Sequence, residues 1–80
     1  MGKRDIEKIF ENAEAEVERN LEIARKCTTY AAVLYRKAKA EEAWGFIWMT
    51  IGGIDKEVDE EFKKEWERYN REFEKILATK

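Results

Sequence analysis

Two stretches of the chain, one near its beginning and one near its end, place their apolar residues three or four positions apart. The first covers about residues 5–26 and the last about residues 55–79. Their apolar positions are Ile6, Ile9, Phe10, Ala13, Val17, Leu21 and Ala24, and then Val58, Phe62, Trp66, Tyr69, Phe73, Ile76 and Leu77. This spacing puts apolar side chains on one face of an α-helix. Both stretches are therefore predicted to be amphipathic helices with one buried face.

The middle stretch, about residues 29–51, is apolar on more than one side. It includes two of the three tryptophans and too many apolar residues to share a single helical face. These residues are Tyr30, Ala31, Val33, Leu34, Tyr35, Ala38, Ala43, Trp44, Phe46, Ile47, Trp48, Met49 and Ile51. A helix with this pattern is either central in its domain or has a partner outside the chain.

Two points along the chain carry signals for the end of a helix. Gly52 and Gly53 predict a reversal between the middle and last stretches. The Cys-Thr-Thr segment at residues 27–29 contains poor helix formers whose hydroxyls can cap a helix. However, no Gly, Pro, Asn or Asp lies between Leu21 and Trp44. The pattern is therefore consistent with either a turn or an unbroken helix at this point.

The predicted fold is all-α, an up-down-up three-helix bundle that forms a single domain of residues 1–80. Three helices of nearly equal length, at about 5–26, 29–51 and 55–79, favour this arrangement. The alternative is a helical hairpin with one long N-terminal helix that runs unbroken to Ile51. The first half of that helix would have no partner within the chain, so the hairpin would have to dimerise.

Composition adds a requirement for a dense core or for oligomerisation. A chain of 80 residues buries little more than about 60% of its unfolded surface, and three Trp, three Tyr and four Phe supply material for a core. The chain has no Pro, His, Ser or Gln, and it has 16 Lys and Arg against 18 Asp and Glu. Such a composition is typical of thermostable proteins from hyperthermophiles and of de novo designed helical proteins.

The missing residue types exclude most enzyme chemistry. Without His, the chain lacks the commonest general base and the usual nucleophile triads, and its one cysteine, Cys27, fits a small apolar role. We therefore expect no enzyme activity, no cofactor and no metal site. A net charge of −2 without a basic stretch argues against nucleic-acid binding. The apolar run from Ala43 to Ile51 is too short to cross a bilayer, so we expect no membrane partner and a cytoplasmic protein, if natural.

The aromatic surplus is the one feature of the sequence that resembles a site. The candidate residues are Tyr30, Tyr35, Trp44, Trp48 and Trp66. They either fill the core, form a surface for a homodimer or a helical protein partner, or line a pocket for an apolar ligand. The function predicted first is a structural or interaction module that self-associates. The alternative is a small apolar-ligand binder with an aromatic-lined pocket between helices.

Overall fold

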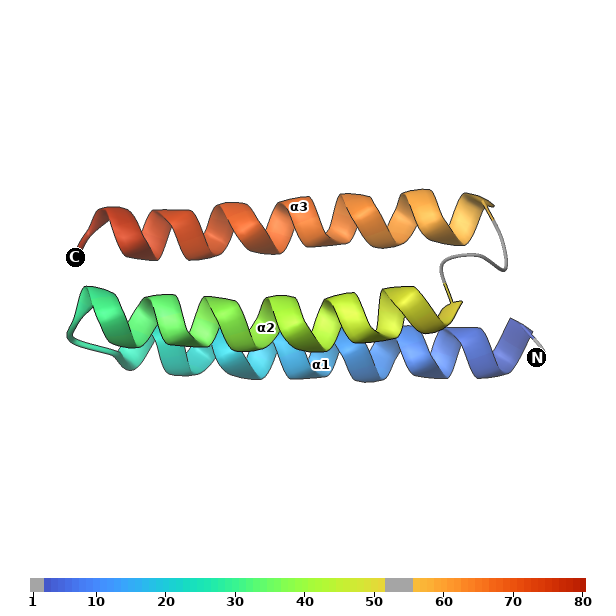
Figure 1. The fold of residues 1–80 in the computed structure, drawn as a ribbon, viewed down its shortest axis with the longest axis horizontal. Helices are drawn as coiled ribbons and strands as arrows, with labels where there is room; N and C mark the ends of the chain where they lie inside the picture. The colour runs from blue at the N-terminus through green and yellow to red at the C-terminus, as the bar shows by residue number, and fades with distance from the viewer. Residues whose placement is uncertain (1–2, 52–55) are drawn as a thin grey trace.

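The chain folds into three α-helices that run side by side in alternating directions (Figure 1). The computed structural model describes residues 3–51 and 56–80. The helices are α1 (Lys3–Lys26), α2 (Tyr30–Ile51) and α3 (Lys56–Ala78). The bundle measures 42 × 17 × 15 Å, so it is only slightly longer than one of its helices. The predicted up-down-up three-helix bundle is confirmed, and the described helix ends fall within two residues of the predicted ones.

The turn between α1 and α2 explains why the alternative with one long helix is wrong. The backbone N–H of Cys27 donates to the carbonyl of Ala24 at 3.1 Å, which tightens the last turn of α1. The hydroxyl oxygen of Thr29 then accepts a hydrogen bond from the N–H of Ala32 at 3.2 Å. Thr29 is therefore the N-cap of α2, and its hydroxyl starts the new helix without Gly or Pro. The predicted turn at Gly52 and Gly53 lies outside the described residues.

The core lies along the line where the three helices meet. α1 and α3 turn their predicted apolar faces inward, while α2 contributes fewer buried residues. The buried apolar residues are Ala13, Val17, Leu21 and Ala24 of α1, Val33, Ala40 and Trp44 of α2, and Phe62, Tyr69, Phe73 and Leu77 of α3. Polar contacts join the helices around this core. Lys37 of α2 pairs with Glu74 of α3 at 2.6 Å, and the hydroxyl of Tyr69 donates to Glu18 of α1 at 3.2 Å.

Candidate interaction surface

Two of the five aromatic candidates, Trp44 and Trp66, belong to a cluster of rings inside the bundle. Trp44 is 4% exposed and stacks on Phe62, with ring centroids 3.9 Å apart and planes at 17°. Phe10 and Tyr69 meet its ring edge-on at 5.9 and 5.7 Å. Trp66 is partly buried, with its ring centroid 6.2 Å from that of Trp44. Large side chains therefore fill the space between the helices at this level.

The other three candidates lie on the surface of α2. Tyr30, Tyr35 and Trp48 are 52%, 55% and 45% exposed. The indole N–H of Trp48 donates to the carboxylate of Asp59 in α3, which holds this ring at the edge of the bundle. The guanidinium of Arg36 lies 5.3 Å from the ring centroid of Tyr35. The five candidates thus do not converge on one pocket, because two are in the core and three are outside it.

The exposed apolar side chains define a surface that we call the outer face of α2. Among the residues that the structure describes, all the exposed large apolar side chains belong to this helix. They are Tyr30, Leu34, Tyr35, Phe46, Trp48 and Met49. Met49 and Phe46 are the most exposed, at 82% and 73%. The candidates predicted from the sequence did not include Leu34, Phe46 or Met49. A helical wheel would have placed all three away from Val33, Ala40 and Trp44.

Small and charged residues complete this face. Ala31, Ala38 and Gly45 lie seven positions apart along α2, and a Cβ added to Gly45 would meet no atom within 4 Å. Glu41 and Glu42 are exposed near the middle of the helix. Neither carboxylate forms an ion pair within the part of the chain that the structure describes.

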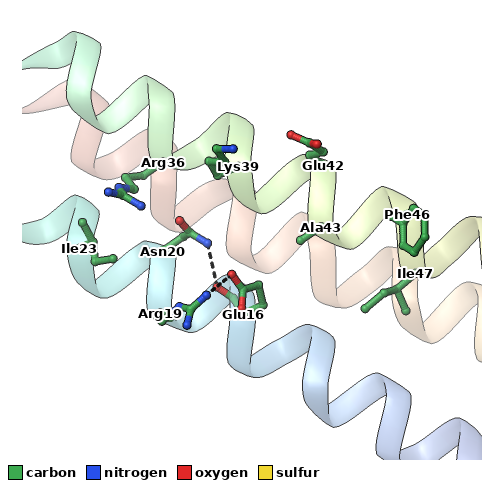
Figure 2. A pocket seen from close by; sticks show the side chains of 10 residues that line it. All are labelled: Glu16, Arg19, Asn20, Ile23, Arg36, Lys39, Glu42, Ala43, Phe46 and Ile47. Atoms are coloured by element: carbon green, nitrogen blue, oxygen red, sulfur yellow. Dashed lines mark hydrogen bonds and ion pairs between the residues drawn. The ribbon is translucent and has the colours of Figure 1, made fainter.

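A groove of about 770 Å³ runs between α1 and α2 beside the outer face (Figure 2). Along α1 its walls carry Glu16, Arg19, Asn20 and Ile23, and along α2 they carry Arg36, Lys39, Glu42, Ala43, Phe46 and Ile47. None of the five predicted aromatic residues lines it. The groove therefore lies elsewhere than the aromatic-lined pocket predicted from the sequence.

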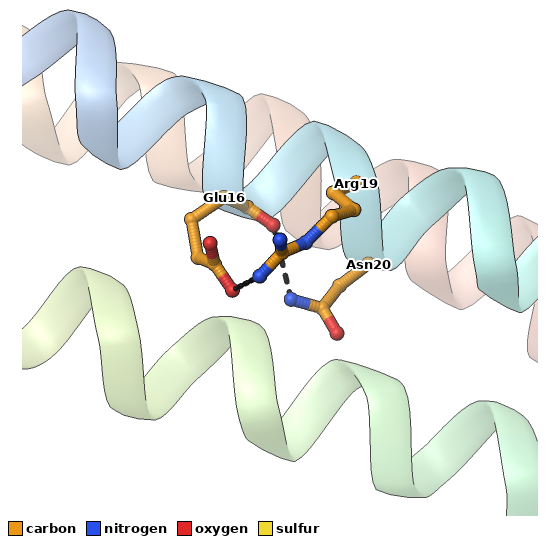
Figure 3. Close-up of polar contacts among 3 residues, drawn as sticks. All are labelled: Glu16, Arg19 and Asn20. Atoms are coloured by element: carbon orange, nitrogen blue, oxygen red, sulfur yellow. Dashed lines mark hydrogen bonds and ion pairs between the residues drawn. The ribbon is translucent and has the colours of Figure 1, made fainter.

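Asn20 is the buried polar residue of this groove. It is 4% exposed, and its side-chain N–H donates to the backbone carbonyl of Glu16 at 3.0 Å. Figure 3 shows the amide directed toward α2, beside the ion pair that joins Arg19 to the Glu16 carboxylate. This ion pair is exposed, so water screens it and it contributes little to stability. The rest of the lining combines basic Arg36 and Lys39 with acidic Glu42 and with apolar side chains.

Shifted pKa values lie apart from the outer face. Burial, and then the nearby carboxylate of Glu18, raise the pKa of Tyr69, so its hydroxyl stays protonated. The hydrogen bond to Glu74 raises the pKa of Lys37. Each shift follows from burial or from a local ion pair, and such pairs also perturb pKa values where no function is involved. Among the described residues, no group of three His, Cys, Asp or Glu side chains is arranged to hold a metal ion.

The fold and the outer face of α2 together define a small all-α protein with one unusually apolar helix surface. No helix in the described part of the chain has the length and apolar character needed to span a membrane. Comparisons with protein-family models, with curated proteins and with solved structures found no match.

Proposed function

We propose that this chain is a non-enzymatic interaction module that self-associates through the outer face of α2. The observation that supports the proposal is the gathering of all exposed large apolar side chains of the described residues on this one helix. Single apolar side chains are common on protein surfaces. These side chains form two groups, one toward each end of α2, with the exposed Lys39, Glu41 and Glu42 between them. Exposed apolar side chains gathered on one surface mark a candidate site of interaction. Pairing with an identical face is the commonest way to cover one.

Met49 and Phe46 are the side chains whose burial stabilises the association most. They are 82% and 73% exposed in the single chain, and full burial of a Met or Phe side chain contributes about 1.5–3 kcal/mol. A charge at either position would have to be desolvated in the complex. The same charge would leave the single chain unaffected, because the position faces water there.

Analytical ultracentrifugation at micromolar concentration tests this proposal. Wild type is expected to sediment as an associated species. Met49→Glu is expected to sediment as a monomer with unchanged helicity by circular dichroism. The matched control is Ala15→Glu, on the exposed side of α1, which should associate like wild type. A Met49→Glu variant that associates as strongly as wild type would contradict the proposal.

The groove between α1 and α2 supports a second candidate function, binding of a small apolar ligand with an acidic group. Its volume of about 770 Å³ lies within the range of ligand pockets. The lining combines apolar Ile23, Ala43 and Ile47 with basic Arg36 and Lys39. Two carboxylates also line it, those of Glu42 and of Glu16, and the second is paired with Arg19. A fatty acid would match this lining, with its chain against the apolar residues and its carboxylate near the two cations.

Calorimetric titration with a long-chain fatty acid tests the second candidate. Wild type should release heat and saturate, and Arg36→Gln should bind more weakly. Arg71→Gln, on the exposed side of α3, serves as the control and should bind like wild type. If both variants bind equally well, the groove is not the site.

A further inference from the structure

We infer that the outer face of α2 binds the same face of a second copy in antiparallel orientation, with the two-fold axis level with residue 40. This pairing rests on the self-association proposed above and identifies the surface that the face binds. Three features of α2 support it. They are the order of its charges, the alternation of small and large residues, and Gly45, which lies among the apolar residues of its C-terminal half.

The charge on α2 changes sign at residue 40. Lys37 and Lys39 precede this position, and Glu41 and Glu42 follow it. An antiparallel pair centred here brings the basic half of each helix against the acidic half of the other. A parallel pair would place Glu41 and Glu42 beside their own copies, and like charges across an interface disfavour that orientation. The order of charges therefore selects the antiparallel pair.

Lys39 is the cation available for this contact. It is exposed, and its ammonium lies 5.6 Å from the ring centroid of Tyr35. Lys37 is already held by Glu74 at 2.6 Å. In the antiparallel pair, Lys39 lies one residue from the level of Glu42 of the second copy. Both residues line the groove beside α1, so they are on the same edge of the interface, and Glu41 is on the other edge. The Glu42 carboxylate lacks an ion pair within the described residues, so the second copy supplies one.

The small residues of the outer face meet large ones in the same pairing. Centred on residue 40, the antiparallel pair sets each small residue level with a larger side chain of the second copy. The matches are Ala31 with Met49, Ala38 with Glu42, and Gly45 with Tyr35. A seven-residue interval keeps such positions on the side that faces a partner helix. Close approach at the small residues lets the large side chains pack over the opposite backbone.

Gly45 has no steric role within the single chain. Glycine weakens a helix interior relative to alanine, and no atom of the described residues lies within 4 Å of the place where its Cβ would stand. The surface above Gly45 is therefore open in the monomer. In the antiparallel pair this open surface receives the ring of Tyr35 from the second copy, and a side chain at position 45 would block it.

Charge reversal tests the orientation. Lys39→Glu would place like charges opposite Glu42 at two symmetric positions, so sedimentation equilibrium at low salt should give a dimer dissociation constant about tenfold higher. The double variant Lys39→Glu with Glu42→Lys reverses both partners and should restore the wild-type constant. Lys63→Glu, on the exposed surface of α3, is the matched control and should leave dimerisation unchanged.

A parallel pair predicts a different result, because residue 39 would meet its own copy. A double variant as weak as the single one, or an unchanged constant for Lys39→Glu, would overturn the antiparallel pairing. If Met49→Glu still abolished association, the proposed function would survive that result. A wild-type chain that sediments as a monomer would overturn both.

Gly45→Gln provides a second and independent test. A Cβ at this position meets no described atom within 4 Å, so circular dichroism should show that the chain stays helical, while dimerisation should be lost. Ala15→Gln is the control for the change in size, because Ala15 is exposed on α1. A Gly45→Gln variant that still dimerises like wild type would overturn the close approach at this position.

Discussion

Trp44 is the residue at which the three helices converge. Its ring stacks on Phe62 of α3 and meets Phe10 of α1 edge-on, while only 4% of the residue is exposed. Aromatic pairs in these geometries contribute about 0.5–1.5 kcal/mol each beyond the burial of their area. One residue of α2 therefore holds both neighbouring helices.

Replacing Trp44 by Ala should lower the free energy of unfolding by about 3–5 kcal/mol, since it removes a buried ring and leaves a cavity. Urea denaturation followed by circular dichroism measures this change. Trp48→Ala, at a residue 45% exposed whose indole N–H donates to Asp59 of α3, should cost clearly less in the monomer, because it leaves no buried cavity. Equal losses for the two variants would show that Trp44 is not the centre of the core.

The contrast between these tryptophans also marks a limit of sequence reasoning. Trp44 and Trp48 are one helical turn apart, and four residues advance an α-helix by about 40° beyond a full turn. On a helix that is apolar on several sides, this rotation decides between core and edge. The sequence identified the aromatic residues of this helix but could not separate the buried ones from the exposed ones. That separation depends on where α1 and α3 lie.

The stability of α2 depends on the N-cap at Thr29, where the helix begins. Thr29→Ala should destabilise the chain by about 1 kcal/mol, because the N–H of Ala32 loses the hydroxyl that accepts its hydrogen bond at 3.2 Å. Thermal unfolding measures the loss. Thr29→Ser keeps the acceptor and should remain close to wild type. An equal loss in both variants would mean that packing of the Thr methyl group matters more than the cap.

Gly45→Ala should have the opposite effect on the same helix. Alanine in place of glycine in a helix interior stabilises by about 0.5–1 kcal/mol, and the added Cβ meets nothing within 4 Å. Chemical denaturation at a concentration low enough to keep the chain monomeric would show the gain. Loss of stability in Gly45→Ala would reveal a crowded site and contradict the open surface.

Helices α1 and α3 were predictable because each carries a single apolar face with regular spacing. The break before α2 was ambiguous, because its signal is only a cap hydroxyl at Thr29 and competing helix formers surround it. The outer face was anticipated as an apolar excess on the middle stretch. Three of its members, Tyr30, Tyr35 and Trp48, were among the candidates named from the sequence. The sequence could not separate them from the buried Trp44, since the inward direction of α2 is set by contacts with two other helices.

On the scale of the whole molecule, the contact between α1 and α3 makes stability depend on pH. Burial raises the pKa of Glu14 above its usual 4.5, and the hydrogen bond and charge of Glu65 raise it further. A carboxyl group with a raised pKa in the folded state binds its proton more tightly there than when unfolded. Its contribution to stability is therefore greatest at low pH and decreases as pH rises through the raised pKa.

Glu14→Gln should accordingly stabilise the protein at neutral pH, and this gain should disappear as pH falls toward 4.5. Urea denaturation of both proteins across this pH range measures the difference. Glu65→Gln relieves the same contact but also removes the ion pair between Glu65 and Arg68, so the double variant should gain little over Glu14→Gln alone. A gain of equal size at every pH would show that ionisation of Glu14 is not responsible.

Met49 gives the molecule a chemical sensitivity that follows from its 82% exposure. An exposed thioether is open to peroxide, and the sulfoxide that forms is polar and is reversed by dedicated reductases. Oxidation at this position would thus place a removable polar group near the C-terminal end of the outer face of α2. Peroxide treatment of dissociated chains should keep them as folded monomers, and enzymatic reduction should restore association. Association would then report the redox state of the surroundings.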